Sequence, residues 1–181
     1  SYAVRHQGCT AGVVITASHN PAKYNGYKVY WAHGGQAAPE QAAAIYACIG
    51  KVPFFSAKTC DFDAAVRDGR IGMIGAEEDA AYYEVTRSVL LAPALLKEKG
   101  ATLPIVYTPL HGAGNIPVRT LLQQAGMTQV FVVPEQELPD GTFPTVTAPN
   151  PENPDAFRLA KALADEKGAT VILATDPDSD R

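Results

Sequence analysis

The first third of the chain alternates short apolar runs with polar turns. Residues 12–16 are rich in Val and Ile, which is typical of a strand covered on both faces, and residues 27–31 form a second predicted strand after the turn signal Asn25-Gly26. Residues 39–50 begin with Pro, end with Gly and carry apolar side chains at helical spacing. The pattern predicts a helix here, packed on the sheet.

The rest of the chain alternates helical and strand patterns more regularly. The expected elements are a helix from about 77 to 98, strand 103–108, helix 117–125, strand 129–133, helix 154–167 and strand 170–175. Strands alternating with helices imply βαβ units and a largely parallel sheet. The Pro-rich connection 134–154 predicts an ordered extended crossing or a functional loop. A glycine-rich stretch, 67–75, indicates a domain boundary near residue 72.

Composition narrows the class of protein. The 181 residues are 46% apolar and 19% charged, which is enough for a core, and the net charge of -4 argues against nucleic acid or an anionic membrane as a partner. Three cysteines without CxxC spacing predict neither a disulfide framework nor a cysteine zinc site. No apolar run reaches the ~20 residues of a membrane span, and the first residues lack a signal-peptide core. We therefore expect a soluble, cytoplasmic protein.

The last predicted strand runs directly into the acidic sequence DPDSDR. Ligands of open α/β sheets bind beyond the carboxyl ends of the strands, and Asp176, Asp178 and Asp180 can converge there because they alternate in a tight turn. Three converging carboxylates favour a hard divalent cation, Mg²⁺ above all. A calcium loop of the EF-hand type is disfavoured because Arg181 stands where that loop needs Gly. A solvated acidic turn without metal stays open.

A second polar sequence, TASHNP, follows the first predicted strand. Ser, His and Asn are common in turns and helix caps, so a purely structural role is one interpretation. A hydrolytic Ser-His pair is disfavoured, because neighbouring side chains on an extended chain point apart and His19 would not reach Ser18. His19 could instead shape the loop or donate a hydrogen bond to an anion.

A third candidate, HGAGNIP, follows the strand at 103–108 and opens a helix. It has two glycines of a dinucleotide-binding G-x-G-x-x-G sequence, but Pro117 stands in place of the third, and the next strand does not end in an acid. A tight strand-to-helix turn is the favoured interpretation.

Together these stretches resemble the α-D-phosphohexomutases, the phosphoglucomutase and phosphomannomutase family. GVVITASHNPAKYNGYKVYW is similar to the family's serine loop and the strand after it, TPLHGAGNIPVRTLLQQAG to a strand-turn-helix of its second domain, and ATDPDSDR to its metal loop. The resemblance runs nearly end to end. It implies two α/β three-layer domains with mixed, largely parallel sheets: 1–72, the C-terminal part of an incomplete first domain, and 73–181, the second domain.

The resemblance also implies roles for particular residues. Ser18 would be the serine phosphorylated in the active enzyme, Lys28 the general base and Arg181 a contact to the phosphoryl group, with His19 a further candidate in the serine loop. The implied Mg²⁺ ligands are Asp176, Asp178, Asp180 and a phosphate oxygen on Ser18.

The implied reaction moves a phosphoryl group between C1 and C6 of a hexose phosphate through a bisphosphate intermediate. Glucose 1-phosphate and glucose 6-phosphate are the favoured pair, with a glucose 1,6-bisphosphate-type activator. A phosphomannomutase, a phosphopentomutase, a noncatalytic phosphosugar-binding module, and a phosphatase with Asp176 as nucleophile stay open. The family's N-terminal strand and its third and fourth domains are not among these residues, so we expect a piece of a larger enzyme that is inactive alone.

Overall fold

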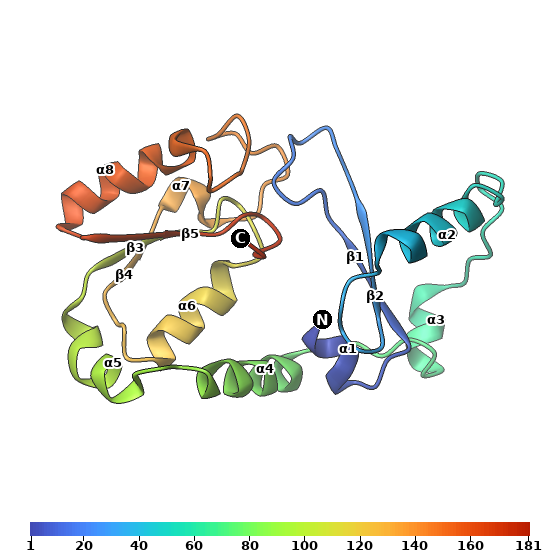
Figure 1. Ribbon diagram of the computed structural model, residues 1–181, viewed down its shortest axis with the longest axis horizontal. Coiled ribbons are helices and arrows are strands. Elements are labelled where there is room, and N and C mark those ends of the chain that lie inside the picture. The colour runs from blue at the N-terminus through green and yellow to red at the C-terminus, as the bar shows by residue number, and fades with distance from the viewer. The chain divides into compact units, whose positions relative to one another are not determined.

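The computed structural model describes residues 1–181, which divide into two compact units (Figure 1). Unit 1 comprises residues 1–14 and 28–82, and unit 2 comprises residues 15–27 and 83–181. The first elements along the chain are α1 (Tyr2–His6), β1 (Ala11–Ile15), β2 (Tyr27–Trp31), α2 (Pro39–Ile49), α3 (Phe62–Arg67) and α4 (Ala76–Ser88). They are followed by α5 (Pro93–Lys99), η1 (Gly100–Thr102), β3 (Ile105–Thr108), α6 (Asn115–Gln124), β4 (Val130–Val132), α7 (Pro134–Glu137), η2 (Pro154–Phe157), α8 (Arg158–Lys167) and β5 (Val171–Ala174).

Unit 1 is built on a two-stranded sheet of β1 and β2. Val4 of α1 packs so closely on Gly12 that a Cβ there would lie 2.5 Å from the Val4 side chain. The expectation that β1 is covered on both faces is wrong, because Val13 and Val14 remain 50% and 39% exposed. The sheet of unit 1 has only two strands, and α2 buries no residue against it, so its faces are not enclosed.

Helix α2 forms where the sequence predicts it. Pro39 occupies the first turn, and the Gln41 side chain accepts hydrogen bonds from the backbone N–H of Ala38, at 2.9 Å, and from the indole of Trp31, at 2.8 Å. The expected packing of this helix on the sheet is absent, since none of its residues is buried. Its apolar side is therefore exposed in unit 1.

Unit 1 contains one buried charged side chain, Glu78, in addition to the buried apolar residues Val4 and Ala65. Glu78 of α4 accepts hydrogen bonds from His6 and Gln7, at the end of α1, through one carboxylate oxygen. The hydrogen bond from Gln7, then that from His6, lowers the pKa of Glu78. The ring of Tyr2 stacks on His6 with 5.2 Å between ring centroids. This cluster holds the first turns of α4 against α1.

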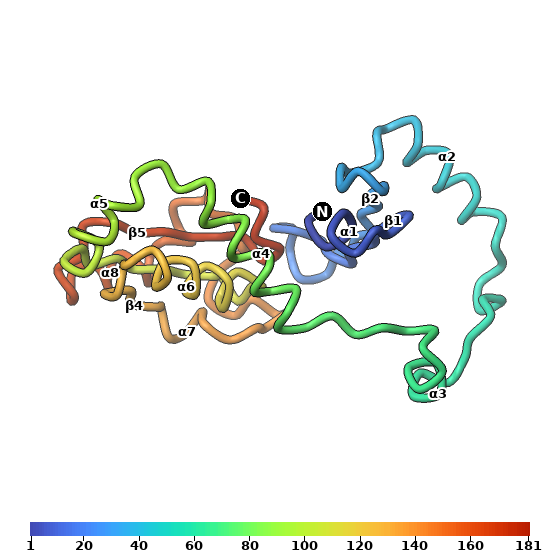
Figure 2. Tube along the Cα trace, turned by 90° about the horizontal axis from the view of Figure 1, so that it is seen from below, coloured from blue at the N-terminus to red at the C-terminus, as the bar shows by residue number.

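Helix α3 was not expected from periodicity, because it is only 6 residues long. A capping signal does mark its start: the Asp61 side chain accepts a hydrogen bond from the backbone N–H of Ala64 at 2.7 Å. In Figure 2 the chain enters and leaves α3 as extended segments. This local cap, together with the burial of Ala65 on one side of α3, stabilises the helix.

Unit 2 contains a parallel three-stranded sheet in the order β4-β3-β5. Val106 pairs in register with Phe131 on one side and Ile172 on the other. Helix α8 packs against β3 and β5, and α6 lies on the opposite side of the sheet beside β4 (Figure 1). The core beneath α8 is formed by Val106, Val133, Ala160 and Ala164. The predicted α/β class and the largely parallel sheet are confirmed.

Several boundaries in unit 2 differ from the expected ones. The single helix expected from about 77 to 98 is two helices, because Ala92, with φ -137° and ψ 60°, is not helical before Pro93, and α5 starts afresh at that proline. The helix expected at 154–167 begins with the 3₁₀ turn η2, and it ends at Gly168 in the left-handed conformation. The Pro-rich connection contains the short helix α7.

None of the helices combines the length and the hydropathy that a membrane crossing requires.

Candidate active site

The acidic loop after β5 brings three carboxylates together. Ser179 takes a left-handed conformation, with φ 59°, and its backbone N–H bonds to the carbonyl of Asp176 at 2.9 Å, which closes a tight turn. One carboxylate oxygen from each of Asp176, Asp178 and Asp180 lies within 4.8 Å of the others. The convergence follows from the turn, because alternate residues then project toward the same point.

Asp176 is the buried member of this group, with no exposed surface. Its Oδ1 accepts hydrogen bonds from the backbone N–H of Asp180, at 3.1 Å, and of Arg181, at 3.2 Å. Burial raises the pKa of Asp176, and the neighbouring Asp178 raises it further. A cation at this point would offset both the lost hydration and the repulsion between carboxylates.

The serine loop, residues 16–26, belongs to the same unit. It is closed at its base by a hydrogen bond of 3.1 Å from the Thr16 N–H to the Gly26 carbonyl. A Cβ at Gly26 would lie 2.2 Å from the carbonyl oxygen of Thr16, so only glycine fits there. The Thr16 hydroxyl accepts from the Ser18 N–H at 2.9 Å and donates to Oδ2 of Asp178 at 3.2 Å. Thr16 thus links the serine loop to the acidic loop, a role for which the sequence offered no separate signal.

The Ser18 hydroxyl lies directly at the acidic group. Its Oγ donates a hydrogen bond of 2.9 Å to Oδ2 of Asp176, although the two residues are 158 positions apart in the chain. Nδ1 of His19 lies 3.2 Å from the Ser18 Oγ and 3.8 Å from the same Asp176 oxygen. The expectation that Ser18 and His19 point apart is wrong, because Ser18 has φ 53° and the chain is bent rather than extended at this residue.

Arg181 and Lys28 are the other two predicted residues. The Arg181 guanidinium forms an ion pair with Glu152 at 2.8 Å, so the structure gives a contact to the sequence NPENP, for which the sequence suggested only a turn and a helix start. Lys28 lies half-buried on β2, in unit 1. The roles of Arg181 and Lys28 stay predictions.

The acidic group has the donor chemistry of a magnesium site. Its three carboxylates offer hard oxygen ligands, and Oδ1 of Asp178 is buried. Ser18 stands at its edge, where a phosphate on Oγ would add further oxygen donors. The residues present therefore fit a small divalent cation.

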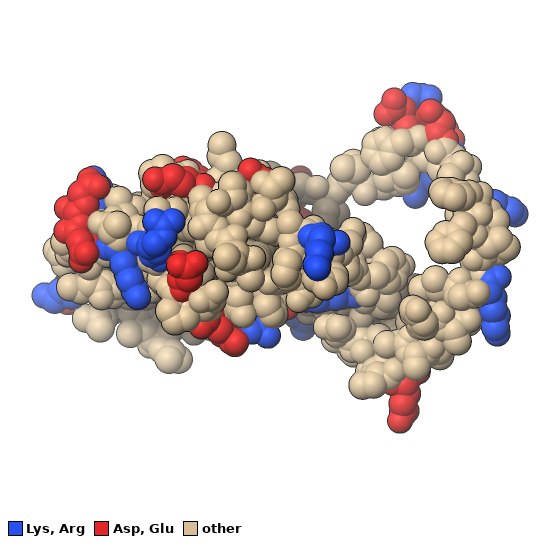
Figure 3. Space-filling view, turned by 90° about the horizontal axis from the view of Figure 1, so that it is seen from above, with Lys and Arg blue, Asp and Glu red and all other residues tan.

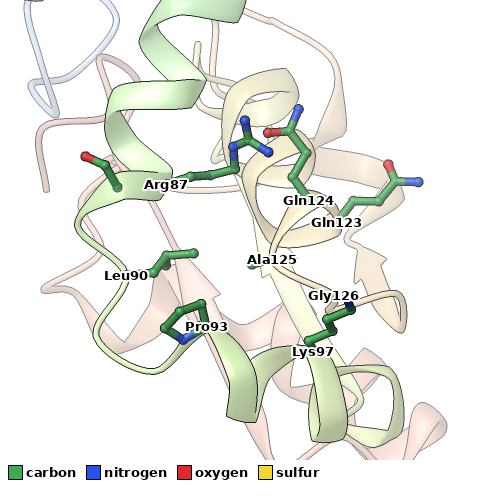
Figure 4. Close-up of a pocket in the computed structure, with 9 residues that line it drawn as sticks. Arg87, Leu90, Pro93, Lys97, Gln123, Gln124, Ala125 and Gly126 are labelled. Carbon is green, nitrogen blue, oxygen red and sulfur yellow. The ribbon is translucent and has the colours of Figure 1, made fainter.

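A separate hollow of about 640 Å³ opens between the end of α4, helix α5 and the end of α6 (Figure 4). Exposed Arg87 and Lys97 and the residues 123–126 contribute to its lining. None of the predicted site residues lies there, so the candidate site is the group around Asp176.

Comparison with known proteins fits this geometry. Residues 82–181 match the model of "Phosphoglucomutase/phosphomannomutase, alpha/beta/alpha domain II", and residues 1–55 match that of domain I of the same family. The chain belongs to the phosphoglucomutase/phosphomannomutase family. The family models leave residues 56–81 unmatched, and the expected domain boundary near residue 72 stays a prediction.

Curated relatives carry several names. The chain is 37% identical to a phosphoglucomutase of Staphylococcus saprophyticus, over 100% of the chain and 32% of the relative. It is 40% identical to a "Probable phosphomannomutase" of Haemophilus influenzae, over 100% of the chain and 36% of the relative. It is also 40% identical to a "Probable phosphoribomutase" of Schizosaccharomyces pombe, over 99% of the chain and 30% of the relative. The chain thus spans about a third of the length of these relatives.

Solved structures show the same fold. A crystal structure of a protein from Thermus thermophilus matches 99% of the chain and 37% of its own length, with a TM-score of 0.73 and 28% identity. A phosphoglucomutase/phosphomannomutase family protein from Burkholderia thailandensis matches 94% of the chain and 32% of its own length, with a TM-score of 0.58 and 19% identity. The second likeness concerns the fold alone.

Proposed function

We propose that this chain carries the phosphoserine and the metal-binding loop of a sugar-phosphate mutase. The observation that carries the proposal is the 2.9 Å hydrogen bond from the Ser18 hydroxyl to Asp176, inside a group of three carboxylates. In most loops a serine only stabilises a turn. Here the Ser18 hydroxyl lies where a phosphate on it could supply an oxygen ligand to a cation held by the carboxylates. Family membership supports this assignment.

Charge explains why a cation belongs to this site. A phosphoryl group on Ser18 would add about two negative charges beside the carboxylates of Asp176 and Asp178, which are already close to each other. We propose Asp176, Asp178 and Asp180 as the protein ligands of Mg²⁺, with a phosphate oxygen on Ser18 as the fourth ligand. Bound there, Mg²⁺ would supply positive charge to the phosphoryl group during transfer.

The proposed reaction conserves phosphate. The bond between phosphorus and Ser18 Oγ breaks, and a bond from phosphorus to a hydroxyl oxygen of the sugar monophosphate forms, which gives a sugar bisphosphate. The proton of that hydroxyl passes to Lys28, the proposed base. The bond from phosphorus to the other sugar oxygen then breaks, this phosphoryl group bonds to Ser18 Oγ, and Lys28 returns its proton to the freed sugar oxygen, so the sugar leaves with its phosphate moved. Because the transition state is loose, positioning and electrostatic stabilisation supply most of the catalysis.

Arg181 and His19 are proposed as donors to the transferring group. The guanidinium of Arg181 has a planar fork that suits phosphate oxygens, and its pairing with exposed Glu152 leaves it exchangeable, since surface ion pairs are weak. His19 already lies 3.2 Å from the Ser18 Oγ and could donate to an oxygen of a phosphate there.

One rival fits the geometry less well. A phosphatase with Asp176 as nucleophile needs a free carboxylate oxygen facing the substrate. Both oxygens of Asp176 already accept hydrogen bonds, Oδ2 from Ser18 and Oδ1 from the backbone of the loop, and the side chain is fully buried. Ser18 is thus the better placed nucleophile.

The substrate is proposed as a hexose phosphate, with glucose 1-phosphate and glucose 6-phosphate first. Relatives at 37% to 40% identity are named for glucose, mannose and ribose phosphates, so overall identity does not choose among them. A glucose 1,6-bisphosphate-type compound is the proposed activator, because it would phosphorylate Ser18. The remainder of a full-length enzyme, including the family's third and fourth domains, is the proposed partner in the cleft.

The test uses a full-length protein containing this chain. It should convert glucose 1-phosphate to glucose 6-phosphate, and Ser18→Ala should reduce kcat by at least about a thousandfold while sugar-phosphate binding persists. Thr10→Ala, outside the serine loop, is the control. Mass spectrometry should place the phosphate on Ser18. Phosphate on Asp176 would establish the phosphatase, and full activity of Ser18→Ala would overturn the proposal. Mannose and ribose phosphates, assayed in parallel, define the substrate.

A further inference from the structure

The turn between β3 and α6 lies directly against the acidic loop. The backbone N–H of Ala113 donates a hydrogen bond of 2.8 Å to the carbonyl of Pro177, which stands between Asp176 and Asp178. A Cβ on Gly112 would lie 2.4 Å from the Cα of Pro177 and 2.7 Å from its carbonyl oxygen. The two backbones therefore touch at a point where no side chain fits.

Gly114 makes a second close approach. A Cβ at this residue would lie 2.6 Å from the hydroxyls of Thr175 and Tyr107 and 2.8 Å from that of Ser179. Thr175 directly precedes the acidic loop, Ser179 lies within it, and the Tyr107 hydroxyl lies 2.8 Å from that of Thr175. Gly112 and Gly114 thus leave the space that the acidic loop occupies.

The turn itself is held in a strained shape. Leu110 and His111 both have left-handed backbones, with φ 46° and 62°, and both are buried. Such conformations cost free energy in residues with a Cβ and persist only where the surroundings impose them. The Leu110 N–H bonds to the Thr108 hydroxyl at 3.1 Å, and the His111 N–H bonds to the Gln136 carbonyl at 2.9 Å.

The His111 ring joins this turn to the connection after α7. Its Nδ1 lies 3.0 Å from the Leu138 carbonyl and its Nε2 lies 3.0 Å from the Thr145 hydroxyl. A carbonyl only accepts, so Nδ1 carries the proton and Nε2 accepts from Thr145. Thr145 in turn accepts from the Gln136 amide at 3.0 Å. This arrangement of protons satisfies both ring nitrogens of His111 and links the turn to Gln136 through Thr145.

We propose that the turn 109–114 positions the acidic loop for its cation, with His111 as the positioning residue that locks the turn and Gly112 and Gly114 as the contact surface. The proposal rests on the proposed metal site. It assigns a role to the HGAG sequence, which neither the reaction nor the predicted ligand set uses. His111 acts only through the turn, since its ring contacts residues outside the acidic group.

The test measures Mn²⁺ affinity of the chain by electron paramagnetic resonance, with thermal unfolding in parallel. Gly112→Ala and Gly114→Ala should each weaken Mn²⁺ binding by about tenfold to hundredfold, the range for residues that orient metal ligands. Gly141→Ala is the matched control, because a Cβ there meets nothing within 4 Å. His111→Ala should also weaken binding, and His111→Asn should recover part of it, since Asn tolerates the left-handed backbone and can donate to a carbonyl.

If the glycine variants do not fold, hydrogen exchange on the unaltered chain tests whether the turn 109–114 responds to the cation. Mg²⁺ should slow exchange of the Ala113 amide together with those of Asp180 and Arg181, and it should leave the Thr142 amide unchanged. Asp178→Asn separates the two proposals: if Mn²⁺ still binds to that variant at full affinity, the metal site is wrong. The role of the turn is overturned if Asp178→Asn abolishes Mn²⁺ binding while the glycine and histidine variants that fold bind Mn²⁺ normally. It is also overturned if Mg²⁺ does not slow hydrogen exchange of the Ala113 amide.

Discussion

The two units have similar patterns of apolar residues in their sequences, but the apolar side chains are buried to very different extents. Unit 2 has a sheet with helices on both sides, and Val106, Tyr107 and Leu110 are fully buried. In unit 1 large apolar side chains of β1 and α2, such as Val13 and Ile49, stay exposed, and in Figure 3 uncharged surface extends between separate charged groups of unit 1. The difference teaches that an apolar strand or an amphipathic helix becomes core only when a further layer is present to cover it.

The largest effect should come from truncating matched isoleucines in the two units. Ile105→Ala in unit 2 removes a side chain that is 2% exposed and should lower the free energy of unfolding by about 2–5 kcal/mol. Ile49→Ala in unit 1 removes one that is 51% exposed and should change it by less than about 0.5 kcal/mol. Hydrogen exchange resolved by segment measures both. Equal losses would show that α2 is covered in solution.

Magnesium should stabilise unit 2 but not unit 1. A ligand at a hundred times its Kd stabilises the folded state by about 2.7 kcal/mol, and the acidic group lies wholly in unit 2. Hydrogen exchange across unit 2 should slow on adding Mg²⁺, while fluorescence of Trp31, the only tryptophan, should report unchanged unfolding of unit 1. Asp178→Asn should remove the effect, and a response that survives it would place the cation elsewhere.

Acid should weaken unit 1 through Glu78. Hydrogen bonds from Gln7 and His6 hold the pKa of Glu78 below its ordinary value of 4.5. The stabilisation is therefore complete above pH 4.5 and is lost as the pH falls from that value through the lower folded pKa. Unfolding of unit 1, followed by Trp31 fluorescence between pH 6 and 3, measures the change. Glu78→Gln should flatten this profile, and an unchanged profile would remove Glu78 as its cause.

Breaking an exposed ion pair should have the smallest effect on stability, and the effect should be similar in the two units. Glu152→Gln breaks the Arg181 ion pair in unit 2, and Asp68→Asn breaks the Arg70 ion pair in unit 1; all four side chains are at least 39% exposed. Each change should alter the free energy of unfolding by less than about 1 kcal/mol, because exposed ion pairs are hydrated and screened. Denaturant titration at low and high salt checks this. A larger loss at Glu152 alone would indicate that its pair orders the acidic loop.

The sequence predicted the fold of unit 2 well, because periodicity there reflects real burial. Strands at 105–108, 130–132 and 171–174 lie within the expected ranges. The break at Pro93 was missed because the apolar pattern continues through it, although proline offered the signal. The burial of unit 1 was overestimated. A hydrophobic pattern shows which face of a strand could be buried, but it does not show whether another element packs on that face.

The convergence of the three aspartates was predictable from the sequence, but the contacts that surround them were not. The spacing of Asp176, Asp178 and Asp180 was enough to expect convergence. The contact of Ser18 with His19 was not, because it depends on a left-handed backbone at a residue that is not glycine. The Thr16 link and the Arg181 pair depend on tertiary packing between distant segments, which local patterns do not encode.

The uncovered sheet of unit 1 should make the molecule prone to self-association. Val13 and Val14 follow each other on β1, so their exposed side chains project from opposite faces of a sheet that has only two strands. An unpaired edge of such a sheet is a template for a strand from a neighbouring molecule. Self-association of this chain should therefore begin at β1 and β2, and concentrated solutions should scatter light long before unit 2 begins to melt.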